Sequence, residues 1–296
     1  MTTRTASTAS TAGAVTGRRA AGSGTGTAAT YRTARALMRL ASATLCPTTV
    51  EGAHHVPDEN VRDGQRQPVI LAGNHLSACD TFFLMAALPR RRLVFLGKQE
   101  YFHMPGPTGR LTRALCTGLG LLPVDRQGGP AAARELLATG TAALARGAAL
   151  ALYPEGTRSP DGLLHRGRPG AAGLALLSGA PLVPLGITGT DRVQPVGRSG
   201  LRPHPVTVRF GAPLPCEEFR RRPARPDGLP SAAALRELTL LLMQRIAELS
   251  GQRYVDSFAP RPAAQRPAPT PTPTRDGGAV ESVSASASAH GRGAAR

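Results

Sequence analysis

The chain has 296 residues, a hydrophobic content of 41% and a formal net charge of +17 at pH 7. This length and hydrophobicity suit a globular protein with one large core or two small ones. So large a positive charge favours an anionic partner, such as a lipid surface or an acidic carrier protein. Aromatic residues make up only 4% and tryptophan is absent, so the composition disfavours nucleic-acid binding and we expect no nucleic-acid partner.

The two ends of the sequence have compositions that predict disorder. Residues 1–30 are largely Thr, Ala, Ser, Gly and Arg, and residues 259–296 are rich in Pro, Ala and Ser. Neither segment carries enough apolar side chains to offset the entropy that ordering a chain costs. The acid-free composition of residues 1–30 also fits a transit peptide, but the segment lacks the apolar region of a secretory signal. We therefore expect one folded domain over residues 31–258 between two disordered tails.

Cysteine spacing and hydropathy disfavour several other classes of protein. The chain has four cysteines, Cys46, Cys79, Cys116 and Cys216, and none of them form a CxxC motif. The sequence therefore predicts neither a zinc site nor a disulfide framework, and a reducing compartment is the default expectation. The uncharged stretch 170–190 is interrupted by Pro181 and Pro184, and it reads as a helix, a turn and a strand. We expect no membrane span.

The folded part opens with YRTARALMRLASATLC, residues 31–46, which has the period of an amphipathic helix. Its expected apolar face comprises five residues: Ala34, Leu37, Met38, Ala41 and Leu45. Arg32, Arg35 and Arg39 fall largely on the opposite face. Such a helix can lie in a lipid interface, or it can pack on the core with its arginines in solvent.

After residue 46 the apolar runs alternate between the patterns of strands and helices. Strands are predicted at residues 68–74, 91–97, 147–154, 181–188 and 205–211, and helices at residues 80–89, 111–120, 130–146, 169–179 and 231–250. Ser231 can cap the final helix and Gly251 can end it. This alternation predicts an α/β fold with a central sheet flanked by helices, preceded by the amphipathic N-terminal helix.

Polar residues follow the first buried strand in the loop NHLSACD, residues 74–80. Binding and catalytic residues of α/β sheets gather where strands end and loops begin. His75 and Asp80 are five residues apart across the start of a helix that Ser77 can cap, so the carboxylate can turn back and fix the imidazole tautomer. The chain has no GxSxG nucleophile elbow, so a base here would activate a hydroxyl of a substrate. Alternatively, Asp80 only caps the helix and His75 is an unrelated loop residue.

Two further loops bring arginines after apolar runs. In YPEGTRS, residues 153–159, Gly156 lets the backbone approach a ligand closely, and the planar fork of Arg158 suits phosphate or carboxylate. Glu155 can position Arg158 or hold the loop. In VDR, residues 124–126, Arg126 follows Asp125 and can form a purely local pair with it. Each arginine taken alone is also compatible with an ordinary surface position.

Taken together and in this order, the motifs resemble the glycerolipid acyltransferase family. The matching motifs are, in chain order, NHxSxxD, a basic residue, VDR, PEGTR and VPLGI. The resemblance runs from about residue 35 to residue 215. Family members, among them bacterial 1-acyl-sn-glycerol-3-phosphate acyltransferases, have an α/β fold and work at membrane surfaces. The resemblance implies transfer of a fatty acyl group from acyl-CoA or acyl carrier protein to the free hydroxyl of 1-acyl-sn-glycerol-3-phosphate, giving phosphatidic acid. It implies no metal and no bound cofactor.

The resemblance also implies a role for each matching residue. His75 becomes the catalytic base and Asp80 its partner. Seven further residues are assigned to the substrate sites, the last of them on the acyl side: Lys98, Arg126, Glu155, Gly156, Thr157, Arg158 and Pro184. The implied partners are the acyl donor, a lysophospholipid acceptor and an anionic membrane surface, with the protein peripheral at the cytoplasmic face of the cell membrane. With a lipid substrate implied, the helix over residues 31–46 becomes an expected interfacial anchor.

Lys98 is the only lysine among the 36 lysines and arginines of the chain. It follows the strand predicted at residues 91–97, and it lies on the same side of the sheet as His75 if the two strands are parallel. A lysine is a compact point charge on a flexible stem, so its use here suits a phosphate site too tight for a guanidinium. The alternative is chance retention of one lysine.

Some positions depart from the family pattern and leave the substrate open. Ala78 and Cys79 stand where the family often has bulky residues. An acyl-cysteine at Cys79 is disfavoured, because the family transfers the acyl group directly. Glycerol 3-phosphate or another lyso-lipid remains an alternative acceptor, and a non-catalytic lipid-binding relative remains an alternative class.

Overall fold

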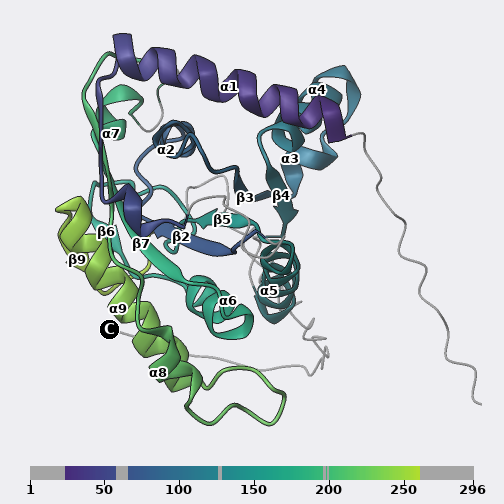
Figure 1. The fold of residues 1–296 in the computed structure, drawn as a ribbon, viewed down its shortest axis with the longest axis vertical. Helices are drawn as coiled ribbons and strands as arrows, with labels where there is room; N and C mark the ends of the chain where they lie inside the picture. Colours follow the sequence, from purple (N-terminus) through teal and green to yellow (C-terminus); the bar gives the residue numbers. More distant parts are fainter. Residues whose placement is uncertain (1–23, 58–65, 126–128, 196–197, 199, 261–296) are drawn as a thin grey trace, which may run out of the picture. The chain divides into compact units, whose positions relative to one another are not determined.

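Seven strands form the central sheet in the order β1-β8-β7-β2-β5-β3-β4 (Figure 1). Their bounds are β1 (Thr48–Glu51), β2 (Val69–Gly73), β3 (Leu93–Lys98), β4 (Leu121–Val124), β5 (Ala149–Leu152), β7 (Leu182–Thr188) and β8 (Val206–Phe210). All neighbouring pairs are parallel except β7 and β8. The expected α/β fold with a central sheet is confirmed.

This computed structural model describes residues 24–57, 66–125, 129–195, 198 and 200–260, apart from the side chains of residues 24–27 and Lys98. Most of the two expected tails, residues 1–23 and 261–296, lies outside these ranges.

Helices cover both faces of the sheet (Figure 1). On one face lie α1 (Gly24–Thr44) and α2 (Asp80–Ala87), and on the other lie α5 (Gly129–Ala145), α6 (Gly170–Ser178), α8 (Cys216–Arg220) and α9 (Ala232–Ser250). Strand β2 shows why both faces need cover, because its buried side chains alternate between two hydrophobic clusters. Val69 and Leu71 join the cluster on the α1–α2 side, and Ile70 and Ala72 join the cluster that includes α6 and α9. A near-continuous apolar run is typical of a strand buried on both faces.

The sequence predicted the long elements and missed the short ones. Five strands and five helices lie where they were expected, and Ser231 caps α9 by accepting a hydrogen bond from the Ala234 N–H at 3.2 Å. The elements that were not predicted are β1, β4, α8, α3 (Glu100–His103), α7 (Thr190–Val193), the 3-10 turn Ala53–His55, and the two-stranded sheet of β6 (Leu164–His165) and β9 (Tyr254–Val255). Helix α4 (Gly106–Gly118) begins before its expected start at residue 111.

Helix α1 corrects the expectation for residues 31–46 in two ways. It begins at Gly24, earlier than expected, and residues near its start pack on other elements. Thr30 lies against Gly118 of α4, and the Tyr31 hydroxyl accepts a hydrogen bond from the Leu93 N–H at 2.9 Å. Its expected apolar face is also divided, since Met38 packs on the core while the Leu37 side chain is 62% exposed. Apolar residues occupy two adjacent rows of this helix, and only tertiary contacts decide which row is buried. None of the described helices is long and apolar enough to cross a membrane.

The close approach of α9 to β7 depends on Gly186. A Cβ atom at this position would lie 2.5 Å from backbone atoms of Leu249 and Ser250, so a larger residue would push the helix away from the strand. The approach carries the end of α9, and Gln252 just beyond it, to the carboxyl end of β2.

Four neighbouring parallel strands, β2, β5, β3 and β4, end at the same edge of the sheet. The loops that the sequence marked as functional follow three of these strands directly. His75 comes after β2, Glu155 after β5 and Asp125 after β4. Ligand sites of open α/β sheets lie outside the carboxyl ends of the strands, so this edge is the place to look for chemistry.

Candidate active site

His75 and Asp80 form the expected pair at this edge. The Nδ1 atom of His75 lies 2.7 Å from Oδ2 of Asp80, and the Asp80 side chain is fully buried. The same carboxylate oxygen accepts the backbone N–H groups of Leu76 at 2.7 Å and Ser77 at 2.9 Å. When the Nδ1–H of a neutral His75 donates a hydrogen bond to Asp80, the Nε2 atom carries no proton. The His75 side chain is 17% exposed, so this nitrogen is placed to act as a base toward a ligand at the edge of the sheet.

Ser77 does not cap helix α2, contrary to the expectation. The N-cap residue is Cys79, without a side-chain cap, and the N–H groups of the preceding loop are instead taken up by Asp80. The Ser77 hydroxyl donates to the backbone carbonyl of Gln194 at 2.9 Å and accepts the Cys79 N–H at 3.3 Å. It therefore joins the His75 loop to the segment after α7.

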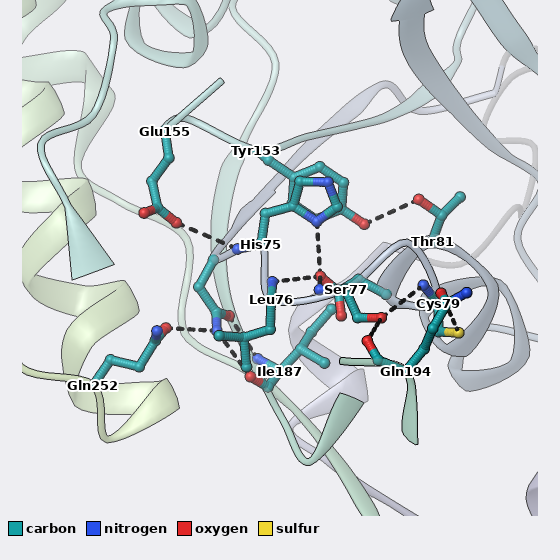
Figure 2. A network of polar contacts seen from close by, with 12 residues as sticks. His75, Leu76, Ser77, Cys79, Thr81, Tyr153, Glu155, Ile187, Gln194 and Gln252 are labelled. Atoms are coloured by element: carbon teal, nitrogen blue, oxygen red, sulfur yellow. Dashed lines mark hydrogen bonds and ion pairs between the residues drawn. The ribbon is translucent and has the colours of Figure 1, made fainter. Parts of the chain in front are cut away.

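Cys79 faces the same segment. Its thiol donates to Oε1 of Gln194 at 3.3 Å, and the side chain is buried (Figure 2). Burial is the main reason that the pKa of this thiol is raised, with the Ser77 hydroxyl opposing the shift. A buried thiol with a raised pKa has little thiolate character, which agrees with the expectation that Cys79 does not carry the acyl group.

The ring of Tyr153 lies against the ring of His75. The two ring centroids are 4.0 Å apart and the planes differ by 5°, so the rings are stacked face to face (Figure 2). The Tyr153 hydroxyl is 3.2 Å from Oγ1 of Thr81, the residue after Asp80. Tyr153 stands inside the YPEGTRS motif, but nothing in the sequence pattern marked it as a partner of His75.

Glu155 is buried and holds the loop, which is one of the two roles the sequence allowed, and its place in the acceptor site stays a prediction. Its side chain is 2% exposed, and its two oxygens accept backbone N–H groups of His75 at 3.3 Å and His165 at 3.0 Å. The carboxylate thus connects the loop after β2 to the chain beyond the PEGTR motif. Burial raises the pKa of Glu155 to about 7, although the two N–H groups and the nearby His165 favour the charged form.

Asn74 joins the first loop to β7 and to the end of α9. Its side-chain oxygen accepts the Ile187 N–H and its amide donates to the Ile187 carbonyl, both at 2.8 Å. The amide also donates to Gln252 Oε1 at 2.7 Å. The Gln252 amide in turn donates to the Gly162 carbonyl at 2.8 Å. These partners are more than 85 residues from Asn74 in the chain, so no local signal could have revealed them.

Hydrogen bonds fix the loop after β5 to the His75 loop and to its own neighbours. The backbone N–H of Ser159 donates to the carbonyl of His75 at 2.7 Å. The Ser159 hydroxyl donates to the Leu163 carbonyl at 2.8 Å, and the buried ring of His165 lies 3.1 Å from the Asp161 carboxylate. The loop is therefore a rigid partner for the His75 loop.

Arg158, Gly156 and Thr157 stand at the outer side of this loop. Arg158 is exposed, and among the described residues its guanidinium has no hydrogen-bond or ion-pair partner, so it is available to an anion. Gly156 has a φ of 76°, which favours glycine, and a Cβ there would lie 3.1 Å from Nε of Arg168. Thr157 is half-buried between them.

The remaining expected residues are only partly placed. The backbone of Lys98 ends β3 in register with Val124, and β3 runs parallel to β5 and so to β2, as the sequence argument required. The Lys98 side chain and the whole of Arg126 lie outside the described residues. Pro184 is buried inside β7, paired with Ala72, and lies three residues before Ile187, the β7 residue bound to Asn74.

One pocket lies away from this edge of the sheet. Its volume is about 480 Å³, and it is lined by residues of α9 and of the segments 166–169 and 254–258. None of its lining residues belongs to the His75 loop or the 153–159 loop. Within the described ranges, no group of three His, Cys, Asp or Glu side chains could hold a metal ion.

The sequence of the chain is similar to known acyltransferases. A family model described as Acyltransferase matches residues 47–188, which contain the His75–Asp80 pair and the PEGTR loop. The 1-acyl-sn-glycerol-3-phosphate acyltransferase of Limnanthes alba is 30% identical over 173 residues, which are 58% of this chain and 56% of that protein. Human 1-acyl-sn-glycerol-3-phosphate acyltransferase alpha is 27% identical over 184 residues, covering 62% of this chain and 59% of that protein. The chain thus spans little more than half the length of these curated relatives.

The fold has a solved counterpart as well. The crystal structure of the 1-acyl-sn-glycerophosphate acyltransferase from Thermotoga maritima matches with a TM-score of 0.55 and 23% identity, over 74% of this chain and 79% of that one. Over residues 47–188 the chain therefore matches the Acyltransferase family model, and its relatives support the resemblance to the glycerolipid acyltransferase family that the motifs indicated. The named relatives within that family are 1-acyl-sn-glycerol-3-phosphate acyltransferases.

Ionisation of Glu155 should make the fold less stable as the pH rises. Because its folded pKa of about 7 lies above the ordinary value of 4.5, the folded state holds more protons between these two pH values. The contribution of protonated Glu155 to the stability of the fold is fully present below about pH 4.5 and is lost as the pH rises through 7. Urea midpoints at pH 5 and pH 8 should show native protein losing on the order of 2 kcal/mol relative to Glu155→Gln.

Glu135, an exposed carboxylate on α5, offers the matched control. Glu135→Gln should have the same pH dependence of stability as the native protein. Equal pH dependence in native protein and Glu155→Gln would show that Glu155 does not titrate in this way.

Proposed function

We propose that this protein transfers a fatty acyl group from a thioester to the free hydroxyl of 1-acyl-sn-glycerol-3-phosphate, forming phosphatidic acid. The observation that carries the proposal is the His75–Asp80 pair, with Nδ1 held at 2.7 Å by a buried carboxylate and the ring at the carboxyl ends of the strands. The names of the relatives supply the reaction and the acceptor.

In the proposed step, Nε2 of His75 takes the proton of the glycerol hydroxyl as that oxygen attacks the thioester carbonyl. Asp80 keeps the ring oriented and stabilises the imidazolium that forms. A tetrahedral intermediate then collapses with cleavage of the C–S bond, and His75 returns the proton to the departing thiol. All bonds made and broken belong to the two substrates and one proton, so the proposal calls on no metal or bound cofactor.

The acceptor phosphate is assigned to the basic residues at this edge of the sheet. Arg158 is exposed and has no partner among the described residues. Lys98 is the last residue of β3, and Arg126 comes two positions after the end of β4 in the sequence. Binding of the phosphate would hold the hydroxyl beside His75, and such positioning supplies much of the rate of a reaction between two substrates. Acyl-CoA and acyl carrier protein are both included as donors in the proposal.

His75→Ala and Asp80→Asn should both lose acyl transfer. The first removes the base, and the second keeps the shape of Asp80 but removes the charge that stabilises the imidazolium. We expect phosphatidic acid formation to fall about 10²- to 10⁴-fold, measured with lysophosphatidic acid and either oleoyl-CoA or oleoyl carrier protein. His54→Ala, an exposed histidine away from the site, should retain native activity.

Other outcomes of this assay separate the rival functions. Product from glycerol 3-phosphate or another lyso-lipid, but not from lysophosphatidic acid, would replace the acceptor. Lipid binding without product from any acceptor would identify a non-catalytic relative. Native activity in His75→Ala would remove the proposed base.

Arg158→Ala should weaken binding of the phosphate. Loss of a charge-assisted hydrogen bond costs about 1.5–3 kcal/mol, so KM for lysophosphatidic acid should rise at least about tenfold. With a monoacylglycerol acceptor, which has no phosphate, the same change should have little effect. Arg146→Ala, an exposed arginine before β5 at the opposite edge of the sheet, is the matched control. An equal loss on both acceptors would argue against a phosphate contact.

We further propose that α1 and α4 contact an anionic membrane at its cytoplasmic face. The two helices pack together, and the leucines on their outer surfaces are between 49% and 71% exposed: Leu37, Leu40, Leu111 and Leu115. Arg32 and Arg39 are exposed on α1 and Arg110 on α4. Exposed leucines beside arginines suit a helix that lies in a lipid interface.

Replacing the exposed leucines of α1 should release the protein from vesicles. In Leu37→Gln/Leu40→Gln, about 1.5–3 kcal/mol of apolar contact is lost for each leucine that enters the lipid. We expect at least tenfold weaker binding to anionic vesicles in a flotation assay, with an unchanged Tm. Leu240→Gln, an exposed leucine on α9 across the sheet, should bind normally. Native binding by the double variant would contradict a membrane contact through α1.

A further inference from the structure

The His75 ring is held along one edge and on one face. Asp80 holds its Nδ1 edge at 2.7 Å, and Tyr153 covers a face with a ring centroid 4.0 Å away and nearly parallel. The remaining Nε2 has no hydrogen-bond partner among the described residues. These contacts come from different loops, since Asp80 follows β2 and Tyr153 follows β5. The stack therefore fixes the loops relative to each other at the ring itself.

Tyr153 is in turn held by the helix that carries Asp80. Its hydroxyl lies 3.2 Å from Oγ1 of Thr81, in the first turn of α2 (Figure 2). Both contacts of the His75 ring are thus tied to two successive residues of one helix turn. A shift of Asp80 relative to Tyr153 would strain both the hydrogen bond to His75 and the stack.

We propose that Tyr153 is a positioning residue for His75. The Tyr153 ring keeps the imidazole in its orientation toward Asp80 and stabilises the imidazolium formed during proton transfer. This inference rests on the proposed function, because it concerns the same base. The face of an aromatic ring attracts a cation, so the stack favours the protonated ring more than the neutral one. Only the transition state and the intermediate carry that charge, so the contact acts on kcat rather than on binding of the acceptor.

Ordinary core packing is the competing explanation, and kinetics can separate the two. A packing role predicts a loss of stability without a selective loss of kcat. The positioning role predicts that an aromatic ring of any kind restores kcat, whether or not it carries the hydroxyl. Tyr153→Phe keeps the ring and removes the hydroxyl, whereas Tyr153→Leu removes the ring and keeps an apolar side chain.

Acyl transfer should be measured for native protein, Tyr153→Phe and Tyr153→Leu under one set of conditions. In Tyr153→Leu we expect kcat to fall about tenfold, equivalent to about 1.4 kcal/mol, with KM for the acceptor unchanged. Tyr153→Phe should stay within about twofold of native kcat, because the face of the ring remains in place. Tyr254→Leu, which removes a half-buried tyrosine from β9, is the matched control and should keep native kcat.

A second measurement does not depend on activity. The chain has seven histidines, so their ring protons can be followed by NMR after selective labelling, with His75 identified by its loss in His75→Ala. A stacked aromatic face shields the protons of the ring beneath it. Tyr153→Leu should move the His75 signals downfield, while Tyr153→Phe should leave them near their native positions.

The two measurements distinguish failure of the inference from failure of the proposed function. Unmoved His75 signals in Tyr153→Leu, or moved signals with native kcat, would overturn the positioning role. A fall in kcat that Tyr153→Phe does not restore would overturn it as well. Absence of acyl transfer in the native protein, with signals that move as expected, would refute the proposed reaction but support Tyr153 as the residue that holds His75.

Discussion

The site depends on one buried carboxylate. Asp80 is fully buried, and burying a charge is costly unless hydrogen bonds replace the lost water. Three N–H groups, all from residues 75–77, converge on a single oxygen of Asp80. The loop after β2 therefore takes its shape around this charge, and the orientation of the His75 ring follows from it.

A second buried carboxylate does similar work for the loop after β5. Glu155 accepts backbone N–H groups of His75 and His165, so it connects the PEGTR loop both to the His75 loop and to its own far end. Asn74 adds a third connection, through Ile187 of β7 and Gln252 beyond α9. Buried polar groups with satisfied partners favour one arrangement over others, which is what a base with a defined direction requires. The outer side of the same loop carries Arg158, which is exposed and has no partner among the described residues.

The layers of the fold give its two faces different surroundings. Helices α5, α6 and α9 cover one face, and α1 covers the other through α2. Only part of the apolar surface of α1 is used for this packing, since Met38 is turned to the core and Leu37 to solvent. The exposed leucines and arginines of this layer are the basis for the proposed membrane contact.

The sequence by itself determined the class of fold and the long strands and helices, because hydrophobic periodicity and turn residues are local information. The spacing of His75 and Asp80 allowed their pairing but did not decide it, and the order of the motifs along the chain favoured it. Short elements such as α8 and β9 were missed because a few residues carry too weak a periodicity to be recognised. Only the tertiary structure decided that Glu155 faces inward, that Tyr153 covers the His75 ring and that Gln252 reaches Asn74. These contacts join residues up to 178 positions apart, and they arise from strand order and helix packing, which no local pattern encodes.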